Sequence, residues 1–99
     1  MKYHVLKLIA PRPTFMSDIT PEERVLMGQH LAYWREMMAA GTVVVFGPVL
    51  DPTGPYGLGV VRLADGADPA AVAAGDPVIR AQRGFRYDIA PMANAIVPG

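Results

Sequence analysis

The sequence predicts a single α+β domain of the ferredoxin-like type, with the element order β-α-β-β-α-β, an antiparallel sheet and helices on one face only. Three observations carry this prediction. A chain of 99 residues has room for one domain, so residues 1–99 are taken as one unit. Strand-like and helix-like segments follow one another in the stated order. The first two predicted strands are apolar on both sides, so the sheet face without helices needs an apolar partner.

The first predicted elements are a strand, a loop and a long helix. The segment Tyr3 to Ile9 has strand composition, and the proline-rich residues 11–20 indicate a loop. The motif Thr20-Pro21-Glu22-Glu23 combines a capping threonine, a proline suited to the first helical position and the acid of a capping box. The helix that begins there should end at Gly41, a residue type favoured just past a helix end.

Two strands should follow this helix. Thr42 to Phe46 is a β-branched run ended by Gly47-Pro48, and its unbroken apolar composition is typical of a strand buried on both faces. Residues 51–55 have the composition of a loop. Tyr56 to Leu63 then reads as a strand that carries two glycines on one side.

The last third of the chain predicts helix and then strand. Asp68-Pro69 opens an alanine-rich helix that Gly75 closes, and Asp76-Pro77 opens a second helical piece ending near Gly84. Phe85 to Ile89 alternates apolar and polar residues, as a half-buried strand does. The residues from Pro91 onward carry no assignable pattern.

Composition excludes several functional classes. Nine basic and nine acidic residues cancel, and no basic stripe is present, so nucleic acid and membrane are not expected partners. No apolar run approaches the roughly 20 residues that span a bilayer, and the N-terminus lacks the features of a signal peptide. Cysteine is absent, which suits a cytoplasmic protein. Two histidines and scattered carboxylates have no metal-ligand spacing, so neither a metal nor another cofactor is expected.

The uncovered sheet face has two interpretations. A hydrophobic fraction of 52% is high for so small a chain and indicates that apolar surface meets a partner. A second copy related by two-fold symmetry is the simplest cover, which predicts a homodimer. A groove for a small ligand on the open sheet is the alternative.

His30 is the main candidate for chemistry. It shares the inward stripe of the long helix with Leu26, Met27 and Trp34. An inward histidine in mid-helix either has a buried partner or faces a cavity, and imidazole suits acid–base chemistry because it titrates near neutral pH. The other histidine, His4, is expected to be structural or to face solvent.

Other candidates have competing local explanations. Asp76 is a good helix cap ahead of a proline, as Asp68 is, and capping alone accounts for both residues. Three aromatic residues are candidates for binding a planar ligand, although aromatic residues in small domains usually belong to the core: Phe15, Trp34 and Phe46.

Taken together, the segments resemble the YCII-related (YciI-like) family. The resemblance covers nearly the whole chain and rests on KYHVLKL at the start, QHLAYWREM at 29–37, AGTVVVFGPVL at 40–50, LGVV at 58–61, AGDP at 74–77 and GFRYDI at 84–89. It implies a ferredoxin-like fold that dimerises through its sheets, of the dimeric α/β-barrel type. It also implies a catalytic pair formed by His30 of the QHL segment and Asp76 of the AGDP segment. A cap uses one carboxylate oxygen, so Asp76 is free to serve both roles.

Two departures from the family pattern bear on the pocket. The residue after Asp-Pro is often aromatic in such proteins and is Val78 here, which predicts a reshaped pocket. The loop 11–20 is longer than in short relatives and is expected to act as a cover.

Two classes of function remain open. The first is a cofactor-independent enzyme of the lyase or isomerase kind, in which His30 and Asp76 act on a small, cyclic or aromatic compound. The second is a non-catalytic module that binds a small ligand or serves only as a structural dimer.

Overall fold

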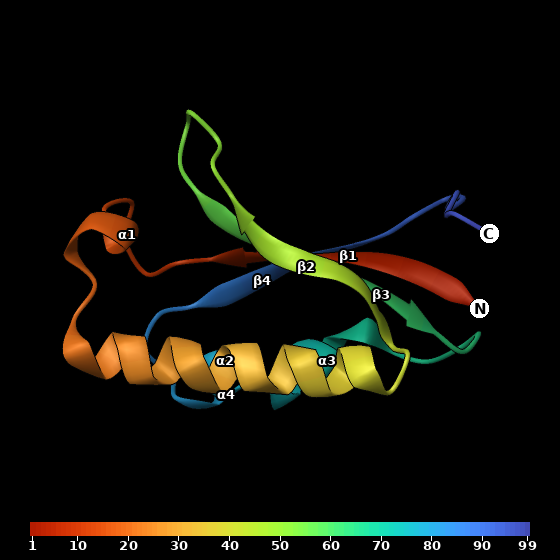
Figure 1. Cartoon of the computed structure of the whole chain (residues 1–99), viewed down its shortest axis with the longest axis horizontal. Helices are drawn as coiled ribbons and strands as arrows, with labels where there is room; N and C mark the ends of the chain where they lie inside the picture. Colours follow the sequence, from red (N-terminus) through yellow and green to blue (C-terminus); the bar gives the residue numbers. More distant parts are fainter.

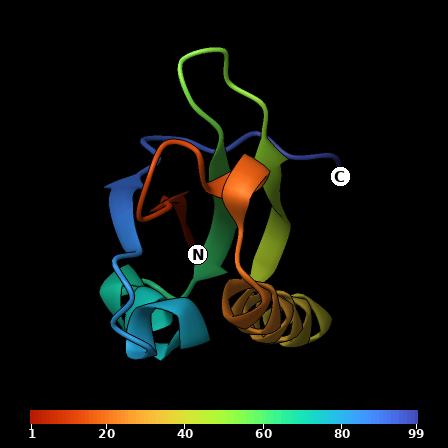
Figure 2. The ribbon, with the colours of Figure 1, turned by 90° about the vertical axis from the view of Figure 1, so that its left-hand side faces the viewer.

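A computed structural model of the chain describes all of residues 1–99 and has the predicted ferredoxin-like α+β architecture (Figure 1). The elements are β1 (Lys2–Ile9), α1 (Phe15–Asp18), α2 (Pro21–Ala39), β2 (Val43–Val49), β3 (Tyr56–Leu63), α3 (Pro69–Gly75), α4 (Pro77–Arg80) and β4 (Arg86–Pro91). The strands form one antiparallel sheet in the order β2-β3-β1-β4. Helices α2, α3 and α4 lie together on one side of the sheet (Figure 2).

The strand register gives the sheet two different faces. On β1, His4, Leu6 and Leu8 are buried against the helices. The intervening residues point to the opposite face, because successive side chains of a strand alternate. There Val45, Val60, Val5 and Ala90 stand in register across all four strands. No helix covers this row (Figure 2), so these apolar side chains lie on an open face, which also carries charged residues such as Lys7 and Asp88.

Helix α2 begins at the predicted capping box. The Thr20 side chain accepts the Glu23 amide, and the Glu23 carboxylate accepts the Thr20 amide. Gly41 follows the helix with a φ of 85°, in the left-handed region that glycine adopts without strain. The long helix therefore starts and stops where local chemistry places it.

The chain between β3 and β4 forms two short helices that meet at Asp76. This residue ends α3 and also caps α4, because its side chain accepts the Val78 amide. Asp68 caps α3 in the same way, by accepting the Ala70 amide. Both Asp-Pro pairs thus start helices, as their sequences predict.

Two groups of buried side chains join the helices to the sheet. Trp34 and Leu6 lie at the centre of the first, with Val43, Val61 and Ala73. The second surrounds the short helices, with Leu8, Phe15, Val78 and Phe85. Phe15 and Phe85 meet edge to face, with ring centroids 5.3 Å apart. This second group fixes the 11–20 segment on the body of the domain.

Three local predictions need correction. Residues 11–20 are not all loop, since Phe15–Asp18 forms the helical turn α1. The Thr14 hydroxyl donates to the Asp18 carboxylate, and the Thr14 carbonyl accepts a hydrogen bond from the Asp18 amide. Strand β2 does not end at Gly47-Pro48 but runs to Val49; it is an edge strand, where proline is tolerated. It is also not buried on both faces within one chain, because Val44 and Val45 are exposed.

His4 is buried, in line with a structural histidine and not with one that faces solvent. Only 7% of it is exposed, and its Nδ1 has no hydrogen-bond partner. No helix of the protein has the length and apolar character needed to cross a membrane.

Candidate active site

His30 and Asp76 lie 46 residues apart in the chain and form a direct hydrogen bond. The distance between His30 Nδ1 and Asp76 Oδ2 is 2.7 Å. His30 projects from the middle of α2, and Asp76 comes from the junction of α3 and α4. The fold therefore brings together the two residues that the sequence singled out.

Asp76 is fully buried, and both of its carboxylate oxygens accept hydrogen bonds. Its Oδ2 accepts three hydrogen bonds, from His30, from Trp34 Nε1 at 2.9 Å and from Tyr87 Oη at 2.6 Å. Its Oδ1 accepts the Val78 amide at 3.0 Å. One oxygen is the helix cap and the other serves the side-chain cluster, as expected for a residue with two roles.

These donors decide the protonation state of the buried carboxyl. Burial on its own raises the pKa of Asp76, but the hydrogen bonds from His30, Tyr87 and Trp34 outweigh burial and hold the pKa below its ordinary value. Burial, followed by the adjacent Asp76 carboxylate, raises the pKa of Tyr87 far above its ordinary value. Asp76 is therefore an anion, and Tyr87 is a neutral phenol that donates to it.

An ionised Asp76 fixes the tautomer of His30. A carboxylate accepts hydrogen bonds and donates none, so Nδ1 carries the proton that joins the two side chains. The neutral ring then keeps an unprotonated Nε2 on its other side. His30 is only 9% exposed and its ring lines a cavity, which leaves Nε2 as the nitrogen available to a bound molecule.

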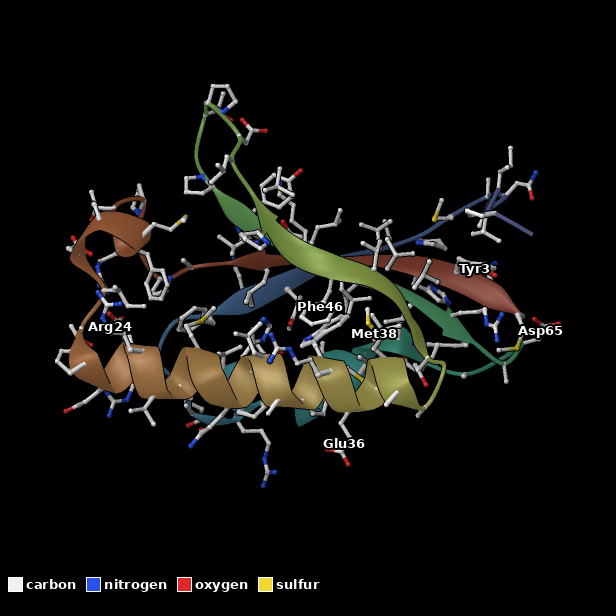
Figure 3. The ribbon with its side chains drawn as sticks, in the orientation of Figure 1. Tyr3, Arg24, Glu36, Met38, Phe46 and Asp65 are labelled. Carbon is white, nitrogen blue, oxygen red and sulfur yellow. The ribbon has the colours of Figure 1, made fainter.

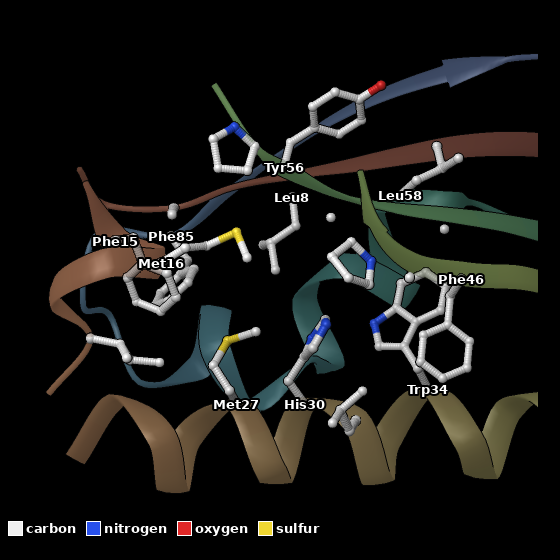
Figure 4. Close-up of a pocket in the computed structure, with 18 of the residues that line it drawn as sticks. Leu8, Phe15, Met16, Met27, His30, Trp34, Phe46, Tyr56, Leu58 and Phe85 are labelled. Carbon is white, nitrogen blue, oxygen red and sulfur yellow. The ribbon is translucent and has the colours of Figure 1, made fainter. Parts of the chain in front are cut away.

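The cavity lies between residues 24–34 of α2, the 11–20 segment and the nearby ends of the strands (Figure 4). Its volume is about 400 Å³, within the size range of sites for small molecules. Most of its wall is apolar: Leu8, Phe15, Met16, Ile19, Met27, Leu31, Trp34, Phe46, Leu58 and Phe85. His30 stands on its helical side, between Met27 and Trp34 (Figure 4).

All three aromatic residues proposed to bind a ligand line this cavity. Phe15 forms the end beside α1, and Trp34 and Phe46 lie together at the other end (Figure 4). The Trp34 and Phe46 ring centroids are 5.9 Å apart with an interplanar angle of 32°. Trp34 also belongs to the core and donates a hydrogen bond to Asp76, so it packs in the core and lines the cavity at the same time.

The model of the YCII-related domain matches residues 1–93, which is nearly the whole chain. The chain belongs to the YCII-related family. No curated protein matches it at a significant level. The resemblance seen in the short sequence segments is thus confirmed at the level of the family.

Tyr87 is the member of the site that sequence reasoning missed in this YCII-related domain. It donates to Asp76, accepts a hydrogen bond from Trp34 Nε1 at 3.1 Å, and lines the cavity. The alternation of β4 placed it on the inward side of the strand together with Phe85. The pattern held no signal for its hydroxyl, because the position of Asp76 relative to β4 is a property of the tertiary structure.

Gly59 was noted as a strand glycine, and the structure gives its function in packing. A Cβ atom at Gly59 would lie 2.3 Å from the Trp34 ring. Only glycine allows the six-membered ring of the indole to come this close to β3 while Nε1 reaches Asp76. The strand glycine is therefore part of the support of the site.

The two expected departures from the family have different outcomes. Val78 is fully buried in the second core group and does not line the cavity, so it does not reshape the pocket directly. The 11–20 segment does form a wall, through residues that include Arg12, Phe15 and Ile19. No three His, Asp or Glu side chains converge as a metal site.

Proposed function

We propose that this YCII-related domain is a cofactor-independent enzyme of the lyase or isomerase kind, acting on a small cyclic or aromatic compound held in the cavity. The arrangement of His30, Asp76 and the cavity supports this proposal. A histidine bound through one nitrogen to a buried carboxylate presents its other nitrogen to an apolar cavity. A histidine oriented by a carboxylate in this way is suited to general acid–base catalysis.

In the proposed reaction, His30 Nε2 removes a proton from a carbon atom beside an electron-withdrawing group of the substrate. Asp76 stays ionised, keeps the ring in place and stabilises the imidazolium that forms. In an isomerase, the ring then returns the proton to another position of the substrate. In a lyase, the electron pair of the broken C–H bond forms a double bond as a neighbouring group leaves with its own electron pair. The apolar wall excludes water, which strengthens the electrostatic interaction between the two side chains.

The same chemistry defines an experiment that does not require the natural substrate. A base able to remove a carbon-bound proton exchanges that proton with solvent. We therefore test small cyclic ketones and lactones in D₂O and follow the loss of their proton NMR signals. His30→Gln is expected to slow any catalysed exchange by about 100-fold or more. His4→Gln removes the histidine outside the cavity and serves as the matched control, with an unchanged rate.

An NMR titration of the two histidine rings completes this test. A compound that binds beside His30 in the cavity has to change the ring signals of His30 as it is added. If no compound changes the His30 ring signals and none exchanges its protons faster than it does in buffer, the enzyme proposal fails. The domain is then a non-catalytic binding or structural module.

We further propose that the domain works as a homodimer joined through the open face of its sheets. The apolar row across that face supports this, since Val45 is 51% exposed in the single chain. A two-fold axis allows the same row to cover itself in a second copy.

A further inference from the structure

The wall of the cavity contains cations and no carboxylate. Its lining includes the guanidinium groups of Arg12 and Arg24, and none of its 22 residues is Asp or Glu. Asp76 lies behind His30 with both oxygens occupied by donors. A molecule in the cavity therefore meets arginine side chains on an apolar background and no acidic side chain.

The charge of Arg12 is already neutralised. Its two terminal nitrogens each lie 2.7 Å from an oxygen of Glu23, and its Nε lies 2.7 Å from the Asp18 carboxylate. Hydrogen bonds from Arg12 lower the pKa of Glu23 to about 2, so this acid is charged whenever the protein is folded near neutral pH. Arg12 thus fastens the 11–20 segment to α2 and has no free positive charge for a ligand.

Arg24 has no such partner. It forms no salt bridge, and the residues three and four positions away on α2 are Pro21, Met27, Thr20 and Gly28, none of them acidic. It stands on the first turn of α2, near α1 (Figure 3). The helical spacing places it on the same stripe as Met27 and Leu31, which also line the cavity.

We infer that the cavity selects a small apolar compound that carries a negatively charged group such as a carboxylate, and that Arg24 binds that group. This inference rests on the proposed function, because it names the substrate class of the same site. Arg24 and His30 are six positions apart on the helix, about 9 Å along the axis. A ring with one carboxylate extends over much of that length, and the flexible arginine side chain covers the rest. The charged group then lies beside the exposed Arg24 while a ring carbon lies at His30.

Benzoate and benzamide are matched probes for this inference. They share size and shape and differ in charge, so a preference for benzoate measures recognition of the anion. Trp34 is the only tryptophan and lines the cavity, so its fluorescence reports binding at this place and no other. Dissociation constants are measured for both probes at two salt concentrations, because salt screens an exposed ion pair.

Arg24→Gln and Arg35→Gln are the variants to compare. Arg35 lies on the same helix, forms no ion pair and has no acidic residue three or four positions away, but it is outside the cavity. We expect Arg24→Gln to weaken benzoate binding about fivefold, the size of an exposed charge pair, and to abolish its salt dependence. Benzamide binding is unchanged in both variants, and Arg35→Gln leaves both probes unaffected.

The possible contrary results separate the inference from the function beneath it. Equal affinity for benzoate and benzamide, or equal loss of benzoate binding in both variants, overturns the inference about charge and leaves the proposed acid–base site standing. Binding of neither probe at millimolar concentration contradicts the cavity as a ligand site and overturns both. Benzoate selectivity that depends on Arg24, without any proton exchange by His30, supports the inference and contradicts only the enzyme.

Discussion

At the scale of single residues, the buried Asp76 carboxylate organises the site. Four donors converge on it from α2, α4 and β4. A buried charge is tolerated only when it is fully hydrogen-bonded, so each donor contributes to keeping Asp76 ionised. The orientation of His30 depends on this ionised state.

Replacing Tyr87 by Phe tests one of the four donors. The Tyr87 hydroxyl bonds to a charged oxygen, whereas the Tyr33 hydroxyl bonds to the neutral backbone carbonyl of Val72 at 2.7 Å. Tyr87→Phe is therefore expected to lower the free energy of unfolding by about 2 kcal/mol and Tyr33→Phe by about 1 kcal/mol. Urea unfolding of the two variants measures this difference. Equal losses would show that the charge on Asp76 adds nothing.

The free energy of unfolding of the domain should fall at acid pH because Asp76 becomes protonated. The folded-state pKa of this carboxyl is lowered, so its contribution is complete above its unfolded pKa of about 4 and is lost as the pH falls below that value. Asp76→Asn, which cannot ionise, is expected to be about 3 kcal/mol less stable than the natural protein at neutral pH. The gap should narrow below about pH 4.

The measurement is the free energy of unfolding of both proteins from neutral to acid pH. Other carboxyls with a lowered pKa, such as Glu23 and Asp18, titrate in both proteins and cancel in the difference. A gap that stays constant into strong acid would mean that Asp76 is not ionised in the folded state.

Sequence reasoning reached part of this site. His30 was placed by helical periodicity, and Asp76 by its capping motif together with the family resemblance. The direct bond between them could not be derived from periodicity, because it depends on how α2 packs beside α4. Tyr87 was visible only as an inward residue, since a strand pattern records which side a residue faces and not what its hydroxyl meets.

At the scale of elements, strand β3 supports helix α2 through a glycine. The close approach of Gly59 and the Trp34 ring sets how near the helix lies to the sheet, and thereby where His30 stands. The two glycines on one side of the predicted strand were the visible sign of this contact. Their partner was not predictable, because nothing local links Gly59 to a helix residue.

Gly59→Ala should disturb this packing, and Gly47→Ala should not. A methyl group at Gly59 overlaps the buried indole, whereas a methyl group at Gly47 meets nothing within 4 Å. We expect Gly59→Ala to cost about 2 kcal/mol and to change the near-ultraviolet circular dichroism of Trp34, with Gly47→Ala close to neutral. An unchanged Trp34 signal in Gly59→Ala would show that the indole does not depend on this contact.

The element boundaries differ from prediction where tertiary contacts act. Helix α1 forms because Phe15 packs on Phe85 and Arg12 holds Asp18, contacts between residues that composition alone reads as a loop. Strand β2 passes through Pro48 because the strand lies at the sheet edge, a place fixed only by the complete topology.

At the scale of the whole molecule, a substitution on the open sheet face tests whether the protein is a monomer or a homodimer. Val45 on this face and Val25 on α2 are both exposed valines, at 51% and 65%. If the chains pair through their sheets, Val45→Glu buries a charge in the interface and yields monomers, while Val25→Glu leaves the dimer intact. Light scattering coupled to gel filtration measures the mass. A natural protein that is monomeric, or a Val45→Glu variant that remains dimeric, would contradict the proposal.

The shared use of Asp76 as helix cap and histidine partner links the site to local opening of the backbone. The Val78 amide is bonded to the same carboxylate that orients His30. When that carboxylate moves out of hydrogen-bond range, the Val78 amide is exposed to solvent and the His30 imidazole loses its hydrogen bond at the same time. The rate of deuterium exchange at the Val78 amide in the ligand-free protein thus reports how often His30 loses its hydrogen bond to Asp76. A compound that binds His30 and stabilises this hydrogen bond should slow the exchange.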